Sequence, residues 1–447
     1  MAKKYTPDDL ANFVFKQLTK AKISVRPSEK VLTELFNTLY YTSLKTEEGQ
    51  FIKVTATLVD QTRLKDFDED NDQLDRWQFY AFERPLEFNI KNMVKLSKAA
   101  DPWSSSLAIY FDDQEELFIY GMIDQAIHYQ SFLNYEREDK PLHPAIIQTT
   151  INGIGILNVM LDYQALATLH QDTLIRQYPN IFKVGPIAEF LKEHSSIPKK
   201  KLEELIGGEL ESEEAEAYQE VAYEYYVQAL CRLLIKIRNY HHGGAILIAR
   251  NRSEGLEKKY AIQYNRISQA IEHLVASVAE DEFIEGQINR RKRRKLDIPL
   301  ADFKSYEANQ LDLEDAYNEM NGAIRFAASL SCVDGLVVLS PRLNVYGFGT
   351  VITEDKAGIK EVYISTTSKP SSTVTLQRSN HFGTRHQSMF AYCRKHPGSV
   401  GFVISQDGEI RAVKSIDGKV YVWENIRVYN FLRSNKIPVV TFSLKPV

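Results

Sequence analysis

Three short motifs between residues 331 and 408 constrain the fold of this chain more than any other feature. Asp334-Gly335 precedes an apolar run at residues 336–339 that is long enough for one buried strand. Residues 383–386, Gly-Thr-Arg-His, precede a helical pattern, and Asp407-Gly408 is a tight-turn signal between two strand-like runs. An acid, an Arg-His pair and a second acid therefore stand at strand ends or at a helix start, where α/β sheets usually bind ligands.

The whole chain is expected to fold as more than one domain of the α/β class. Its 447 residues exceed the length of a typical single domain. We predict an α+β N-terminal domain and a C-terminal domain with a mixed β-sheet flanked by helices. The expected boundaries are 1–192 for the N-terminal domain, 193–216 for a linker, 217–432 for the C-terminal domain with an insertion at about 252–310, and 433–447 for a C-terminal tail.

The N-terminal region carries signals for both helices and strands. Thr6-Pro7 and Ser28-Glu29 each place a capping hydroxyl ahead of a helical pattern, so two helices are predicted to begin there. Residues 107–111 and 117–122 predict two strands, and the spacing of apolar residues at 159–175 predicts a helix.

Two segments far apart in the sequence follow the same pattern. Residues 93–122 and 324–350 both read helix, acid, strand, turn, strand, and both end with a glycine after a tyrosine, at Tyr120-Gly121 and Tyr346-Gly347. The likeness is either a decayed duplication or a chance similarity between two short α/β hairpins. From the sequence alone we favour chance.

Composition indicates a cytoplasmic protein in a reducing compartment. The chain has three cysteines and no Cys-x-x-Cys pair, which argues against a zinc site or a disulfide framework. No apolar run approaches the length of a membrane span, and the N-terminal residues lack the apolar core of a signal peptide, so we expect no membrane association. A net charge of −4 does not suggest that the chain as a whole binds polyanions.

The three motifs, in this order, resemble the diadenylate cyclase domain of bacterial DNA-integrity scanning proteins and membrane-bound cyclases. That family carries Asp-Gly-Ala before a strand, Gly-Thr-Arg-His-Arg before a helix, and a Ser-Glu-Glu turn. Here the same places read Asp-Gly-Leu at 334–336, Gly-Thr-Arg-His-Gln at 383–387 and Ser-Gln-Asp at 405–407. A helical pattern at 230–240 followed by Gly-Gly-Ala-Ile-Leu-Ile at 243–248 is similar to the opening of that domain.

The resemblance implies a nucleotidyltransferase that condenses two ATP molecules into cyclic di-AMP or a related cyclic dinucleotide for signalling. It assigns catalytic roles to Asp334, Arg385, His386 and Asp407. It assigns nucleotide binding to Gly335, Leu336, Gly383, Thr384, Gln387 and Ser405. A divalent metal ion, Mg²⁺ or Mn²⁺, is expected on Asp334 and Asp407. Family cyclases work as face-to-face dimers, which implies a homo-oligomer, and some bacterial members carry an N-terminal sensor domain of the DACNV kind, an arrangement that this chain resembles.

These residue types suit the chemistry. Phosphoryl transfer is catalysed mainly by positioning the reactants and by neutralising charge on the phosphate oxygens. Arg385 offers a planar fork for two phosphate oxygens, His386 offers a further donor, and amide groups at a helix start favour anions. Asp334 stands beside a glycine that allows close approach of the backbone to a phosphate.

Three departures from the family pattern keep other functions open. Gln387 replaces the second arginine of the family, Leu336 replaces its alanine, and Gln406 replaces its first glutamate. One alternative is therefore a catalytically inactive nucleotide-binding sensor. Another is a nucleic-acid-binding protein that uses the basic run at residues 290–295, although such a run is more often a solvated helix end or linker.

Overall fold

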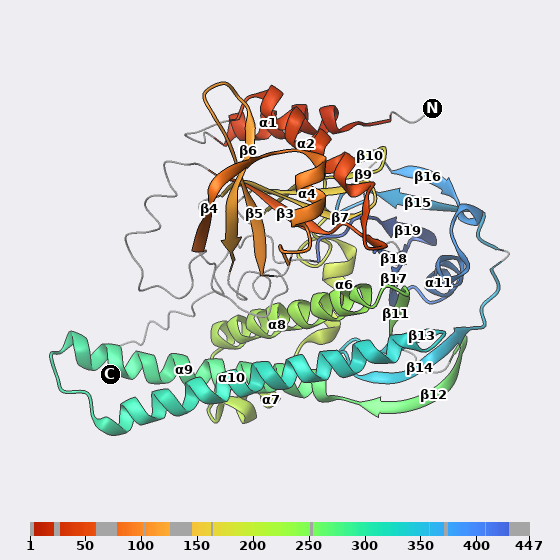
Figure 1. The fold of residues 1–447 in the computed structure, drawn as a ribbon. Coiled ribbons are helices and arrows are strands. Elements are labelled where there is room, and N and C mark those ends of the chain that lie inside the picture. Colours follow the sequence, from red (N-terminus) through yellow and green to blue (C-terminus); the bar gives the residue numbers. More distant parts are fainter. Residues whose placement is uncertain are drawn as a thin grey trace. The chain divides into compact units, whose positions relative to one another are not determined.

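The computed structural model consists of two compact units, and the boundary between them falls at Gln177 and Tyr178 (Figure 1). The structure describes residues 4–21, 27–59, 78–101, 104–125, 145–161, 164–250, 254–356, 358–370, 374–406 and 408–428. Both units contain a mixed β-sheet and helices, which confirms the predicted α/β class. Among the described helices, none combines the length and the apolar character needed to cross a membrane.

Unit 1 opens with two helices that begin where the sequence predicts. Helix α1 (Pro7–Lys20) starts with a capping box between Thr6 and Asp9, and α2 (Glu29–Ser43) starts with the Ser28 side chain accepting from the amide of Val31. A third helix, α4 (Ile90–Leu96), follows later in the chain. All three contribute buried residues to one core with the sheet, because each presents an apolar stripe to it.

The sheet of unit 1 has the strand order β10-β9-β8-β7-β3-β5-β6-β4. Strands β3 and β5 are parallel, and the other neighbours are antiparallel. The strands are β3 (Val54–Val59), β4 (Gln78–Glu87), β5 (Ser105–Phe111), β6 (Leu117–Asp124), β7 (Ala145–Gly153), β8 (Ile156–Leu161), β9 (Gln164–His170) and β10 (Thr173–Ile175), beside a small hairpin of β1 (Thr46–Glu47) and β2 (Gln50–Phe51). The strands predicted at 107–111 and 117–122 are thus confirmed as β5 and β6.

The helix predicted at residues 159–175 is wrong, because this segment forms β8, β9 and β10. Buried positions recur at a spacing of two on β8, at Leu157 and Val159, and again on β9, at Ala167 and Leu169. Each strand alone has the alternation of a half-buried strand. The turn between the two strands interrupts this alternation, so that over the whole segment the apolar spacing resembles a helical period.

Unit 2 has a larger sheet with the order β12-β14-β13-β11-β17-β18-β19-β15-β16. Its strands are β11 (Gly244–Ala249), β12 (Leu256–Tyr264), β13 (Leu336–Leu339), β14 (Val345–Ile352), β15 (Glu361–Ser365), β16 (Thr375–Arg378), β17 (Ser399–Ile404), β18 (Ile410–Ile416) and β19 (Lys419–Trp423). Helix α11 (Thr384–Lys395) packs on one face, where Met389 and Phe390 join Leu247 and Val403 in a common core.

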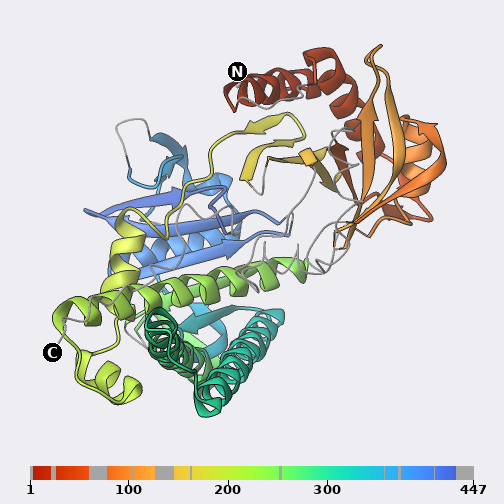
Figure 2. The ribbon, with the colours of Figure 1, turned by 90° about the vertical axis from the view of Figure 1, so that its left-hand side faces the viewer.

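The segment predicted as a linker, residues 193–216, contains helical structure of unit 2. It spans the end of α6 (Pro186–Ser195), all of α7 (Lys199–Ile206) and the start of α8 (Ser212–Asn239). The insertion predicted at 252–310 supplies edge strand β12, helix α9 (Arg266–Arg293) and the first part of α10 (Leu300–Ser329). Helices α9 and α10 lie side by side as a long hairpin, seen lengthwise in Figure 1 and nearly end-on in Figure 2.

The two units share strand order and strand direction over seven strands. The series β4-β6-β5-β3-β7-β8-β9 in unit 1 corresponds to β12-β14-β13-β11-β17-β18-β19 in unit 2. Within each series one pair is parallel, β3 with β5 and β11 with β13, and it occupies the same place. The likeness therefore extends well beyond the hairpin seen in the sequence.

The register of the two sheets also agrees. Gly121 lies between Ala81 and Ala108, and Gly347 lies between Ala261 and Val338. Each of these glycines follows a tyrosine, and both Ala81 and Ala261 follow a tyrosine as well. The structure thus favours a decayed duplication over the chance similarity expected from the sequence.

Candidate functional site

The predicted motifs meet at one edge of the sheet in unit 2. Strands β11 and β13 are parallel, with Ile246 beside Val337, so the residues that precede the two strands are neighbours. Strand β17 runs antiparallel to β11, and Gly244 pairs with Ile404 at its end. The Asp334 motif before β13 and the Ser405 motif after β17 therefore flank the start of β11.

The turn at residues 241–243, just before β11, is contacted by residues from several elements. Arg385 Nη1 donates to the carbonyl oxygen of His242 at 3.4 Å, and His242 Nε2 lies 3.2 Å from Cys332 Sγ, two residues before Asp334. Gly243 has a φ of +68°, and a Cβ there would lie 2.8 Å from Arg385 Nη1, 3.0 Å from the carbonyl oxygen of Ile404 and 3.4 Å from the amide nitrogen of Gln406. The structure thus gathers residues of two motifs, Arg385 and Gln406, and Cys332, which precedes the third motif, around one turn.

Helix α11 presents its first residues to solvent at this edge. Gly383 is the N-cap and has no side-chain cap, and Gly383, Thr384 and Arg385 are all exposed. The first amide groups of a helix have no partner within the helix and favour anions. A phosphate group could therefore contact both these amides and the Arg385 guanidinium.

His386 differs from the expected phosphate donor because it lies inside the unit. Its side chain is buried, and Nε2 lies 3.4 Å from Arg411 Nη1. An arginine can only donate, so Nε2 must accept and the ring proton must reside on Nδ1. Arg411 also donates to Glu409 and, at 3.0 Å, to Glu424, so it bridges His386 to two carboxylates.

Two residues that depart from the family pattern have roles in packing. Gln387 Nε2 donates to the carbonyl oxygen of Phe382 at 2.6 Å, which closes the segment before α11. Leu336 is buried in the core beneath α11. Gly335 has a φ of +120°, and a Cβ there would come within 2.5 Å of the Gly349 carbonyl carbon, so close strand packing accounts for this glycine.

Of the two carboxylates expected to hold a metal ion, only one lies among the described residues. Asp334 is exposed at the sheet edge, whereas Asp407 lies outside the described residues, between Gln406 and Gly408. Among the described side chains, no group of three or more His, Cys, Asp or Glu is placed to hold a metal ion.

Four further residues lie near this edge that the sequence motifs did not indicate: His242, Cys332, Arg411 and Arg238. Arg238 lies beside the β17–β18 turn, where a Cβ on Gly408 would be 3.6 Å from its side chain. Burial lowers the pKa of Arg238 to about 10, so the group remains a cation at neutral pH. Basic residues at a helix end are usually solvated, so the sequence held no signal for this position.

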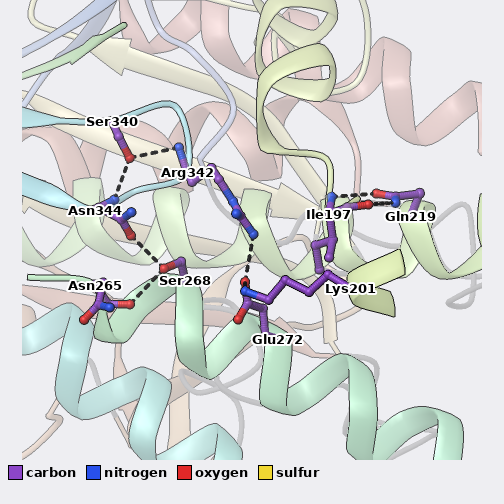
Figure 3. A network of polar contacts seen from close by, with 9 residues as sticks. All are labelled: Ile197, Lys201, Gln219, Asn265, Ser268, Glu272, Ser340, Arg342 and Asn344. Carbon is purple, nitrogen blue, oxygen red and sulfur yellow. Dashed lines mark hydrogen bonds and ion pairs between the residues drawn. The ribbon is translucent and has the colours of Figure 1, made fainter. Parts of the chain in front are cut away.

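A second polar cluster lies at the opposite end of β13 and is fully engaged in packing (Figure 3). Glu272 of α9 receives Lys201 of α7 at 2.5 Å and Arg342 of the β13–β14 turn at 2.7 Å. Asn344 of the same turn accepts from Ser268 of α9 at 2.6 Å. This network ties α7, α9 and the turn together, and its mutual pairing gives it a structural role.

Comparison with known proteins identifies part of unit 1. Residues 21–124 match the family described as "Probable sensor domain DACNV". No curated protein and no solved structure matches the chain. The chain therefore carries a probable sensor domain in its N-terminal unit, as the sequence predicts.

Proposed function

We propose that this chain is a diadenylate cyclase-type nucleotidyltransferase whose unit 2 condenses two ATP molecules into a cyclic dinucleotide under the control of unit 1. One observation carries the proposal: Arg385 and Gln406 of two sequence motifs, and Cys332 just before the third, converge on the turn at 241–243. Motifs that match a family by chance have no reason to meet at one sheet edge. The sensor match in unit 1 supports the regulatory half of the proposal.

The exposed residues at this edge have distinct tasks in the proposed reaction. Arg385 and the first amides of α11 hold phosphate oxygens and neutralise the charge that develops on them. The 3′-hydroxyl of each ATP loses its proton and attacks the α-phosphorus of the other, so that two phosphodiester bonds form and two pyrophosphates leave. Because the reaction needs two nucleotides facing each other, we propose that two copies of unit 2 meet through this edge.

The donor set fits a nucleotide-bound divalent cation rather than a metal cage made of protein alone. Mg²⁺ and similar ions in phosphoryl-transfer sites use one or two carboxylates and take their other ligands from phosphates and water. Asp334 is the described residue that would hold the ion, with Asp407 as the second candidate. The ion would supply charge neutralisation at the phosphates.

A non-catalytic nucleotide receptor is the second candidate function. Gln387 is bonded to Phe382, and His386 Nε2 is engaged by Arg411. Two groups that correspond to phosphate donors in the family thus serve the fold of unit 2. Such a site would bind a nucleotide through Arg385 and the start of α11 but stabilise the transition state less.

Incubation of the full chain with ATP and Mn²⁺ or Mg²⁺ separates the two functions. Formation of a cyclic dinucleotide, identified by mass spectrometry, supports the cyclase. Tight binding of ATP without a cyclic product over a long incubation supports the receptor. Absence of both binding and product would overturn both proposals.

The structure gives little support to nucleic-acid binding by residues 290–295. Arg290–Arg293 form the last turn of α9, where cations suit the helix dipole. Arg291 pairs with Asp302 at 3.2 Å, and Arg290 Nε donates to the carbonyl oxygen of Gly286. These contacts agree with the solvated helix end favoured from the sequence.

A further inference from the structure

Helix α10 carries an apolar stripe that the rest of unit 2 leaves uncovered. Leu300 is 69% exposed, Phe303 is 46% exposed and Leu311 is 64% exposed. The inner side of the same helix is buried at Asn309 and Ala316. Exposed apolar groups that gather on one side of a helix can mark an interaction surface.

The residues between these three complete one exposed side of the helix, which we call the stripe. Leu300 and Leu311 are about three turns apart and lie on nearly the same side of α10. Lys304, Glu307 and Ala308 occupy the turns between them and are also exposed. The stripe is thus apolar at its ends and has one base and one acid in its centre.

The stripe is self-complementary when two copies of α10 lie antiparallel to each other. In an antiparallel pair of α10 helices centred between Ser305 and Tyr306, Leu300 of one copy lies opposite Leu311 of the other. In the same register Lys304 lies near Glu307 of the other copy, while Phe303 and Ala308 lie at opposite flanks of the contact. A twofold axis repeats each contact, so one register pairs the two leucines and the base with the acid twice.

The charges beyond this core agree with the same register. The end of α9 and the turn that leads into α10 carry the exposed bases Lys292, Arg293, Arg294 and Lys295. In the antiparallel pair this turn lies beside the middle of the partner helix, where the exposed acids are Asp312, Glu314 and Asp315. Opposite charges therefore flank both ends of the apolar contacts, which favours this pairing over a parallel one.

We propose that a second copy of this chain docks on the stripe, so that two α9–α10 hairpins form an antiparallel four-helix bundle. This assigns residues 292–295 of the basic run to the recognition of the partner hairpin. The interface is separate from the edge that holds Asp334 and Arg385, and the inference does not depend on the proposed enzymatic function.

The particle mass of the full chain tests the proposal directly. Light scattering after gel filtration should show that Leu300→Glu and Leu311→Glu each halve the mass of the particle, because each change places two buried charges in the symmetric interface. Leu376→Glu is the matched control, since Leu376 is 48% exposed on β16, which is no part of the α9–α10 hairpin. A monomeric wild-type chain, or an unchanged mass in both leucine variants, would overturn the proposal.

A charge exchange tests the register. Lys304→Glu and Glu307→Lys should each raise the dissociation constant at least about tenfold, because each places like charges opposite one another twice. The double variant should restore most of the affinity. Failure of the double variant to recover, with circular dichroism showing intact helices, would contradict this register.

A disulfide gives a third test that does not rely on weakening the interface. In a Cys332→Ser background, Leu300→Cys with Leu311→Cys should form a covalent dimer under mild oxidation. The two positions in one chain are about 17 Å apart along the helix, too far to bridge each other. A chain that stays monomeric and instead binds DNA or anionic vesicles through residues 290–295 would overturn the proposal.

Discussion

Gly243 is the residue on which the proposed site depends most directly. Its φ of +68° disfavours any side chain, and a Cβ would press on Arg385 Nη1 and on the carbonyl oxygen of Ile404. We expect Gly243→Ala to lower the free energy of unfolding by about 1–2 kcal/mol and to weaken ATP binding by displacing Arg385. Urea denaturation and ATP titration measure the two effects. Gly286→Ala in α9 is the control, because open space surrounds that helical glycine and the change should be neutral or stabilising.

We expect the charge of Asp334 to affect activity and its packing to have no effect on stability. The side chain is exposed at the sheet edge, so Asp334→Asn keeps its shape and removes a carboxylate ligand. Under the proposed function, cyclic product should fall by a factor of about a hundred or more, with the urea midpoint unchanged. Unaltered turnover in this variant would rule out a role for Asp334 in metal binding, while a lowered urea midpoint would assign the residue to stability.

The positions of the exposed candidate residues at the ends of elements were easier to predict from the sequence than the surroundings of the buried ones. Asp334, Thr384 and Arg385 stand at element ends that local patterns reveal, and the structure places them there. The burial of His386 against Arg411 depends on the pairing of β17 with β18, and the contact between His242 and Cys332 joins residues 90 positions apart. Such contacts follow from tertiary packing, which a single sequence does not reveal.

Helix α11 is held at its C-terminal end by one carboxylate. Glu354, which follows β14, is largely buried and bonds Lys395 at 2.8 Å and His396 at 2.9 Å. Hydrogen bonds from Lys395 and His396 lower the pKa of Glu354 below its usual value. Because the pKa is lower in the folded state, the stabilisation is present above the unfolded-state pKa of about 4.3 and is lost as pH falls through the folded-state value.

Glu354→Gln should therefore lower the free energy of unfolding at about pH 7 by about 1 kcal/mol, the size expected for a partly screened ion pair. The difference from wild type should disappear as the pH falls below the pKa of Glu354. Urea denaturation at several pH values gives the comparison. Glu361→Gln is the control, since Glu361 is exposed at the start of β15. A difference that persists at low pH would show that shape, not charge, matters at this position.

Elements with strong terminal signals were predictable from the sequence, and those defined by pairing were not. The caps at Thr6 and Ser28 fixed the starts of α1 and α2 because the capping bonds are local. The segment 159–175 failed because the antiparallel pairing of β8 with β9 overrode its apparent helical period. From the sequence, the region 252–310 was predicted only as an insertion. In the structure its strand β12 pairs with β14 and forms the edge of the sheet.

On the scale of the whole molecule, the repeated sheet explains why two glycines are needed at corresponding places. A Cβ on Gly121 would lie 2.1 Å from the carbonyl oxygen of Tyr80, and a Cβ on Gly347 would lie 3.0 Å from that of Tyr260. In both units the glycine lets an inner strand approach the edge strand next to a shift in register. The sequence showed the Tyr-Gly pairs, but only the strand order shows that they share one structural position.

Gly121→Ala should therefore loosen unit 1, and Gly347→Ala should loosen unit 2. Each change overpacks a backbone contact, for which about 1–3 kcal/mol is expected, and Gly121→Ala should be the more severe because its contact is shorter. Hydrogen exchange measured by mass spectrometry on the full chain should show faster exchange in β4 and β6 for the first variant and in β12 and β14 for the second. Gly322→Ala in α10 is the control, since nothing lies near that glycine. Equal loss of protection in both units from either variant would mean that the two sheets unfold together and do not act as separate copies.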